Sequence, residues 1–275
     1  MENRRNIGHL AAVATFVTIV AGALSPACAS AQVLSDEWKF RALVYMWMPT
    51  LRGGATLPGN NTTDFDVKFH TLLNHLKMAG MGSLEAQRGR WGVFTDVIFM
   101  NLGGTKTTTR NGTIDGVPVG VTANLGLDLK AVIWTLAGSY RVQAEPESSL
   151  DVFAGARMLW LQPTLKFDIG EEVGPFVGPN RTGSRSTTGQ NWDAIVGSKG
   201  RVGFGANRKW FIPYYVDIGT GESQFTWQGA AGIGYVFSWG EVVATWRYLD
   251  YNMKSSDKLQ DLTINGPLVG VAFRW

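Results

Sequence analysis

From about residue 38 onward, polar and apolar residues alternate with a period of two along most of the chain. At the C-terminal end Phe273 and Trp275 share one parity, and Arg274 has the other. This period is typical of β-strands, in which successive side chains point to opposite faces. The alternation therefore predicts an all-β fold. The predicted strands are approximately 38–51, 77–88, 91–108, 117–142, 150–168, 191–204, 210–220, 224–237, 241–254 and 259–275.

Charged residues within these segments keep to one face. In segment 191–204, Asp193, Lys199 and Arg201 are odd-numbered, whereas Trp192 and its apolar neighbours are even-numbered. A lysine or arginine that faces lipid at mid-depth costs about 2–4 kcal/mol. We therefore predict that the charged face lines a polar interior and that the apolar face contacts lipid. The predicted interior residues are Lys39, Arg41, Glu85, Asp96, Arg141, Asp151, Arg157, Asp193, Lys199, Arg201, Asp217, Arg247 and Arg274.

A soluble barrel or sandwich would show the same alternation of polar and apolar residues. Its apolar face would be bulky and point inward, and its outer face would be rich in Lys and Glu. Here the charged face also carries glycines, among them Gly155, Gly197 and Gly234. We therefore favour the membrane-spanning fold, which needs a closed sheet because lipid offers no partner to open backbone groups.

Tryptophans collect at the ends of the predicted strands, as expected for aromatic belts at the two membrane interfaces. One end carries Trp38, Trp91, Trp210, Trp239 and Trp275. The other end carries Trp192 and Trp227.

The connections indicate an up-and-down order with both termini in the periplasm. The turns on the side of the termini are short, whereas the two longest connections, about 52–76 and 169–190, lie on the opposite side. Short periplasmic turns and long outer loops are the rule for such barrels. Segment 62–70 could add an eleventh strand and 173–177 a twelfth. We predict a transmembrane up-and-down antiparallel β-barrel of about ten strands, with eight or twelve as alternatives.

The N-terminal region has the pattern of a cleaved signal peptide. Arg4 and Arg5 precede an apolar run over 10–24, and the triplet 29–31 reads Ala-Ser-Ala. A membrane anchor is the alternative, but the run is short for a spanning helix, which needs about 20 apolar residues. We therefore predict that residues 1–31 are a signal peptide.

The remaining chain, 32–275, is predicted to be one barrel domain without cysteine. Cys28 lies within the predicted signal peptide, and the residues before it make a poor lipoprotein motif. The expected mature chain holds no disulfide and no thiol nucleophile. It has 23 basic and 21 acidic residues, because Arg4, Arg5 and Glu2 leave with the signal peptide. A nucleic-acid partner is therefore not implied.

Several short motifs support a resemblance. They are Trp38-x-Phe40 with Tyr45-x-Trp47, Arg88-Gly89-Arg90-Trp91-Gly92 followed by Asp96, Gly155-Ala156-Arg157, Thr226-Trp227-Gln228, Arg247-Tyr248-Leu249-Asp250-Tyr251 and Phe273-Arg274-Trp275. With these motifs the chain resembles small, largely uncharacterised outer-membrane β-barrel proteins of Gram-negative bacteria. The resemblance implies a location in the cell outer membrane, with lipid and lipopolysaccharide as neighbours. It also implies insertion by the barrel assembly machinery through the C-terminal strand, which in most such proteins ends in Phe rather than Trp.

The strand number limits the predicted function. Eight strands leave an interior that side chains fill, whereas sixteen leave an aqueous channel. We expect the interior charges to pair and plug the lumen, and Arg157 with Asp151 and Arg201 with Asp193 are plausible pairs. A structural or surface-interaction role follows. The alternative is a narrow passive channel for small solutes, biased towards anions because the predicted interior holds eight basic and five acidic residues.

An enzyme is a third and more remote interpretation. The predicted mature chain has only two histidines, His70 and His75, in the first outer loop near Asp64 and Asp66. A hydrolase could use such a pair to activate water, but the spacing matches no signature, and solvated loop residues explain it as well. We predict no enzymatic activity, no cofactor and no metal site.

Leucines in segment 71–77 indicate a short amphipathic turn at the rim.

Overall fold

The computed structural model describes residues 36–57, 61–114, 117–145, 148–173, 176–177, 181–186, 188–205, 207–254 and 259–275. All of them belong to one compact unit, which spans Leu34–Trp275. The predicted signal peptide, residues 1–31, lies outside the described residues. Among these residues, no helix is both long and apolar enough to cross a membrane.

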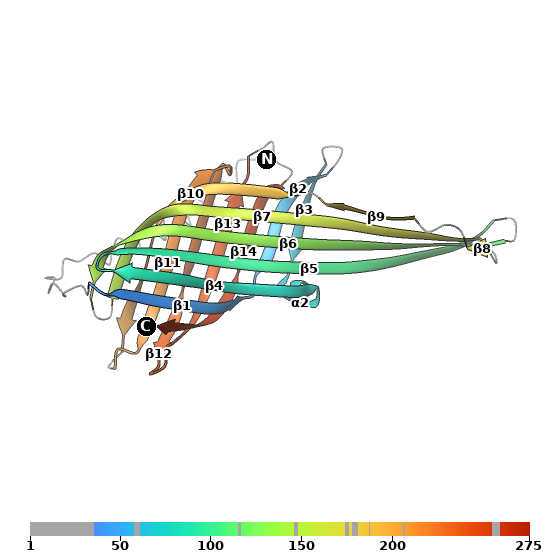
Figure 1. The fold of residues 1–275 in the computed structure, drawn as a ribbon. Helices are drawn as coiled ribbons and strands as arrows, with labels where there is room; N and C mark the ends of the chain where they lie inside the picture. Colours follow the sequence, from blue (N-terminus) through green and yellow to red (C-terminus); the bar gives the residue numbers. More distant parts are fainter. Residues whose placement is uncertain are drawn as a thin grey trace. The chain divides into compact units, whose positions relative to one another are not determined.

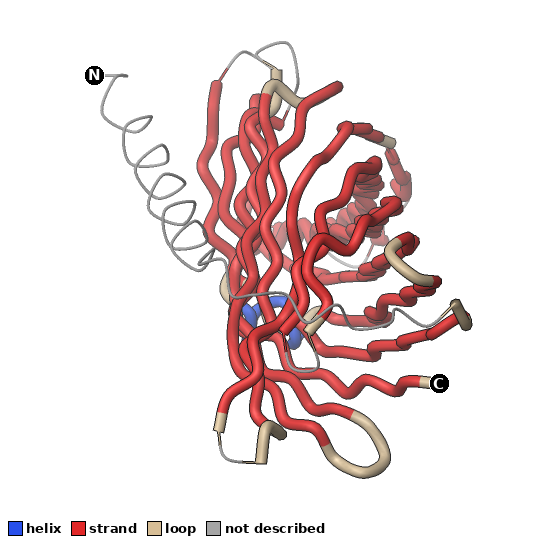
Figure 2. Tube along the Cα trace, turned by 90° about the vertical axis from the view of Figure 1, so that its left-hand side faces the viewer, coloured by secondary structure: helices blue, strands red, loops and turns tan. Residues whose placement is uncertain are grey.

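Ten strands close into an antiparallel barrel (Figure 2), which confirms the predicted fold class. The ring runs in the order β1 (Trp38–Trp47), β4 (Leu76–Arg88), β5 (Trp91–Ile114), β6 (Val117–Ala144), β7 (Ser148–Val173), β10 (Gly189–Phe204), β11 (Trp210–Gly221), β12 (Phe225–Val236), β13 (Glu241–Asn252) and β14 (Leu259–Arg274). The last strand pairs with the first from Arg41↔Arg274 to Trp47↔Leu268, so the ring has no open edge there.

The segment predicted as an eleventh strand does form a strand, but outside the ring. It is β3 (Asn61–Val67), which pairs with β2 (Thr50–Leu57). Strand β2 in turn pairs with the first half of β14, directly after β1 has ended. The extra strand therefore extends the wall on the outer side without changing the number of strands in the ring.

Three small elements complete the outer side. The predicted amphipathic turn is a short helix, α2 (Phe69–Asn74), whose Leu72 is buried. Strands β8 (Phe176–Val177) and β9 (Arg181–Ser186) both pair with β7. The predicted twelfth strand at 173–177 is thus reduced to the two residues of β8 and the end of β7, and it lies outside the ring.

Strands β5, β6 and β7 are much longer than the others, with 24, 28 and 26 residues. A tilted strand needs about 9–11 residues to cross a bilayer. The three strands therefore run on together as a sheet beyond the barrel, with β8 at its tip (Figure 1). This extension points away from the C-terminus and from the short turns, of which two contain Gly89 and Gly205 at positive φ.

The outward face of the barrel is apolar over a band of limited height. On β5, Trp91, Val93 and Val97 are exposed at this face, and the next outward polar residue towards the extension is Asn101. Asn101 lies beside Lys130 of β6, which lies beside Gln162 of β7. Ten residues of a strand tilted by about 40° rise about 25 Å, which is the height of the apolar band of such barrels. The row of polar residues therefore marks the outer membrane interface.

Aromatic rings line the other rim almost continuously. Ring contacts join Trp38, Phe40 and Trp275 with centroid distances of 6.2 and 5.8 Å. A second run passes from Trp210 to Phe273 through Tyr235, Phe237 and Trp239, and Trp91 packs on Tyr140. Towards the outer interface, Trp192 packs edge-on against Trp134, and Trp227 stacks on Tyr248. Of the tryptophans predicted for the girdle, three begin strands, two lie just outside strand ends and two lie near the outer ends of β10 and β12; they are, in this order, Trp38, Trp91, Trp210, Trp239, Trp275, Trp192 and Trp227.

Candidate functional site

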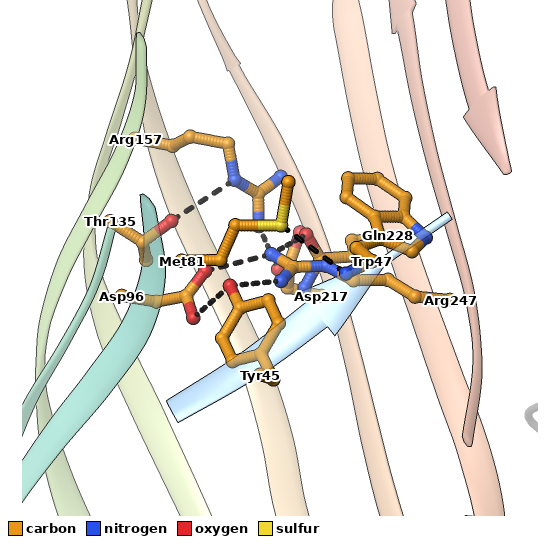
Figure 3. Close-up of polar contacts among 9 residues, drawn as sticks. All are labelled: Tyr45, Trp47, Met81, Asp96, Thr135, Arg157, Asp217, Gln228 and Arg247. Carbon is orange, nitrogen blue, oxygen red and sulfur yellow. Dashed lines mark hydrogen bonds and ion pairs between the residues drawn. The ribbon is translucent and has the colours of Figure 1, made fainter. Parts of the chain in front are cut away.

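The middle of the lumen is crossed by a layer of buried polar side chains. Arg157 of β7 is fully buried, and its Nη2 donates to Oδ2 of Asp217 on β11, which is also buried. Its Nε donates to Thr135 Oγ1 on β6 over 3.4 Å. Figure 3 shows these side chains pointing towards one another from separate strands. An ion pair without access to water fills this part of the lumen instead of lining a water-filled path.

Arg247 of β13 forms the second half of the same layer. Its Nη2 donates to Asp96 Oδ1 over 2.9 Å and to Gln228 Oε1 over 3.0 Å. Its Nη1 donates to Tyr45 Oη over 2.9 Å, and that hydroxyl donates to Asp96 Oδ2 over 2.7 Å (Figure 3). The guanidinium also lies 5.0 Å from the ring of Trp47. These contacts join β1, β5, β12 and β13 across the interior.

The outer half of the lumen contains a cluster of buried apolar residues. Trp47 lies at its centre: the indole Nε1 donates to the carbonyl of Gly266, and the backbone N–H donates to Met81 Sδ. Sequence reasoning predicted a charged interior and did not identify this cluster. The signal was present, since the members share the parity of the charged residues. They are Tyr45, Trp47, Ile98, Met100, Ile133, Leu159, Leu249, Tyr251, Met253, Leu262, Ile264 and Leu268.

An aromatic layer lies on the periplasmic side of the charged layer. Phe94, Phe153 and Tyr215 pack with centroid distances of 5.1 Å for Phe94–Phe153 and Phe153–Tyr215 and 6.4 Å for Phe94–Tyr215. A Cβ at Gly197 would come within 2.6 Å of the ring of Phe153. The glycine on the inward face therefore makes room for the aromatic ring.

At the periplasmic end of the lumen, three arginines contact one carboxylate. Glu241 is buried, and it accepts from Arg201 Nη1 over 3.0 Å and from Arg274 Nη2 over 2.7 Å. Arg41 Nε lies 3.3 Å from its other oxygen. The excess of positive charge here is partly open to solvent. Sequence reasoning missed Glu241, although it has the parity of Arg247 on the same strand.

Two further ion pairs lie at this end. Arg141 donates to both oxygens of Asp151 over 2.7 and 3.0 Å. Lys199 Nζ lies 2.7 Å from Glu85 Oε2. Lys39 lies exposed at the start of β1.

The ion pairs suggested from the sequence are not the ones that form. Arg157 pairs with Asp217 and not with Asp151, and Arg201 pairs with Glu241 and not with Asp193. Asp193 instead accepts from Asn191 Nδ2 over 2.7 Å and from the backbone N–H of Ser223 over 2.9 Å. Both suggested pairs join residues of one strand, whereas the carboxylates that Arg157 and Arg201 contact lie on other strands, β11 and β13.

The two histidines of the outer loop lie on or next to α2. His75 Nδ1 is 2.8 Å from the carbonyl of Thr71, and Asp66 accepts from Arg52 Nε over 3.0 Å. Within the described part of the chain, no hydrogen bond or ion pair joins His70 or His75 to a carboxylate. The described residues also contain no cluster of three or more His, Cys, Asp or Glu that could hold a metal ion.

The chain matches no protein-family model and no curated protein. Its structure is similar to the outer membrane protease OmpT from Escherichia coli, with a TM-score of 0.52 and 10% identity over 90% of this chain and 99% of that chain. The translocator domain of the autotransporter NalP from Neisseria meningitidis gives a TM-score of 0.38 and 14% identity over 98% and 97%. Ail from Yersinia pestis gives 0.31 and 13% over 87% and 99%.

The fold is that of an outer-membrane β-barrel. The likeness to OmpT, at this identity, concerns the fold alone. The apolar outer band and the aromatic rims agree with it, since they match the hydrocarbon core and the interfaces of a bilayer. The protein is therefore placed in the outer membrane.

Proposed function

We propose that this protein is a closed outer-membrane barrel, which anchors an extended sheet at the cell surface and has a structural or surface-interaction role. The observation that supports this most directly is the burial of Arg157, Asp217 and Arg247 in the middle of the lumen. A conducting pore would hydrate such charges, whereas here each is bonded to a protein partner.

The apolar cluster around Trp47 supports the same proposal from the outer side. A solute would have to pass first through tightly packed apolar side chains and then through the charged layer. Apolar spaces of this kind stay dry. Two successive barriers of different chemistry make passive flow of small solutes unfavourable.

The extension of β5, β6 and β7 supports the surface part of the proposal. It is joined along its whole length by antiparallel pairs, from Trp91↔Tyr140 to Ile114↔Val117 between β5 and β6. A hydrogen-bonded sheet outside the membrane is a suitable platform for contact with a partner, because binding residues are often carried on projecting segments held by a scaffold.

A non-enzymatic role is part of the proposal. His75 contacts Thr71 and Asp66 contacts Arg52, so these two groups do not form a general base with its orienting carboxylate.

Insertion by the barrel assembly machinery through β14 is likewise proposed and is supported by the closing position of that strand.

A narrow anion-preferring channel is the second candidate, and the periplasmic end favours it. Arg41, Arg201 and Arg274 surround the single carboxylate of Glu241, and rings of basic side chains are typical of anion-selective pores. This arrangement could attract anions into the periplasmic mouth even if the layers above it block their passage.

Planar-bilayer conductance separates the two candidates. We expect the purified mature protein to give no steady channels, while a sixteen-stranded porin inserted under the same conditions conducts. Insertion is checked independently by the heat-modifiable gel shift of the recovered protein. Steady anion-selective currents that weaken in Arg201→Gln would contradict the closed barrel and support the channel.

A further inference from the structure

Three lysines lie on the outside of the wall formed by β4 to β7, around one aspartate. Lys77 Nζ lies 2.5 Å from Asp128 Oδ1, and Lys166 Nζ lies 2.7 Å from Asp128 Oδ2. Lys130 lies two residues from Asp128 on the same outward face of β6 and is exposed. Two ammonium groups thus contact one carboxylate, and with Lys130 the cluster has an excess of two positive charges.

The backbone around this lysine cluster is adapted to it. The register between β4 and β5 shifts between Leu76 and Met78, which leaves Lys77 as the extra residue of a bulge. Bulges commonly redirect a side chain. On β5, between β4 and β6, a Cβ at Gly103 would collide with the ends of Lys77 and Asp128. The glycine therefore allows the Lys77–Asp128 pair to cross β5.

The lysine cluster begins at the level where the outward face changes from apolar to polar. Lys130 belongs to the row that marks the outer interface, beside Asn101 and Gln162. Towards the periplasm, the same wall exposes Leu84, Val97 and other apolar side chains that suit acyl chains. Basic side chains at an interface attract anionic lipid headgroups. An occupant of this surface would therefore have its anionic group at the lysines and its acyl chains on the wall below.

We propose that the surface formed by Lys77, Lys130, Lys166 and Asp128 binds the phosphate groups of a phosphorylated glycolipid of the outer leaflet. Asp128 holds one ammonium group on each of its two oxygens, so both cations are directed to the same part of the surface, where one phosphate can contact both. Lys130 supplies a further cation nearer the apolar band. The inference rests on the outer-membrane location and is independent of whether the lumen conducts.

The test uses the refolded mature protein in detergent micelles and bisphosphorylated lipid A as the probe. Native mass spectrometry measures the apparent Kd from the fraction of protein that carries a lipid adduct. We expect three single variants each to weaken binding about fivefold: Lys77→Gln, Lys130→Gln and Lys166→Gln. The triple variant should weaken binding about 100-fold. These factors correspond to a loss of about 1 kcal/mol for each interfacial lysine.

Three controls make the outcome decisive. Lys209→Gln removes an exposed lysine from a periplasmic turn and should leave the Kd unchanged. The triple replacement by arginine keeps the charge and should retain binding. Lipid A from which the phosphates have been removed should bind the parent protein no better than the triple glutamine variant.

Two results would overturn the proposal. One is equal binding of lipid A to the parent and to the triple glutamine variant. The other is binding that inorganic phosphate, at the concentration of the probe, displaces fully, because the surface would then hold a free anion and not a glycolipid. Since neither readout depends on conductance, failure here is distinguishable from failure of the closed-barrel proposal.

Discussion

At the scale of single residues, the interior is governed by charges whose partners lie on other strands. Arg157 and Asp217 are both fully buried, so each depends on the other for neutralisation. Removing one partner of a buried pair is expensive because it leaves an uncompensated charge, whereas replacing both can be nearly neutral. The exposed pair of Arg52 with Asp66 is the natural comparison within the same chain.

We therefore expect Asp217→Ala to lower the free energy of unfolding by about 3–5 kcal/mol. Asp66→Ala should lower it by at most about 1 kcal/mol, because exposed pairs contribute little. Urea unfolding in detergent, followed by the heat-modifiable gel shift, measures both. Equal losses in the two variants would show that Arg157 reaches water and that the lumen is not sealed there.

At the scale of elements, strands β4, β6 and β7 are linked outside the membrane through Asp128. Hydrogen bonds from Lys166 and then Lys77 hold the pKa of Asp128 below its ordinary value of 3.8. A carboxylate with a lowered pKa stabilises the folded state at neutral pH. That contribution is lost as the pH falls through the lowered pKa, where the carboxylate becomes protonated.

We expect the Asp128 carboxyl to titrate below 3.8 in the parent. In the double variant Lys77→Gln, Lys166→Gln its pKa should rise towards the ordinary value, because both hydrogen-bond donors are lost. Carbon-13 NMR of labelled aspartate carboxyls follows the titration, and Asp128→Asn assigns the signal. A pKa that is the same in parent and double variant would exclude the three-residue contact in solution.

At the scale of the whole molecule, closure of the barrel depends on long-range contacts. Glu241 of β13 joins Arg41 of β1, Arg274 of β14 and Arg201 of β10. The first two arginines face each other in the β1–β14 register that closes the ring. Without the carboxylate, like charges would meet at the closing seam.

Glu241→Gln should therefore weaken the closed barrel by about 2 kcal/mol, the worth of a hydrogen bond to a charged group. The loss should shrink at high salt, which screens the repulsion among partly exposed arginines. Glu145→Gln, in an exposed periplasmic turn, is the matched control and should have little effect. Urea unfolding at low and high salt measures the difference, and a salt-independent loss would contradict the electrostatic origin.

Most of the fold could be predicted from the sequence because its information is local. Alternation identified the ten strands of the ring, and the facing of Asp193, Lys199 and Arg201 followed from their shared parity. The sequence predicted a strand around Phe65 but did not predict its place outside the ring. That place depends on the path of the chain, which pairs this strand with β2 and not with β4.

The candidate site could be predicted only in part. Parity showed which charges share the interior but not which of them meet. Ion pairs such as Arg157–Asp217 and Arg247–Asp96 depend on where each strand lies around the ring and how far it is shifted along the axis. Parity placed the members of the apolar cluster around Trp47 on the inward face, but which of them pack together depends on how the strands are arranged around the ring.

The sequence by itself determined the strands, their facing and the preference for a bilayer, because a period of two and the cost of charge in lipid act residue by residue. Only the tertiary structure decided that three arginines share Glu241, that a buried charged layer and an apolar cluster lie inside the ring, and that Lys77 reaches Asp128 across Gly103. The physical reason is that these contacts follow from the closure of the ring and the stagger of its strands, which no single segment encodes.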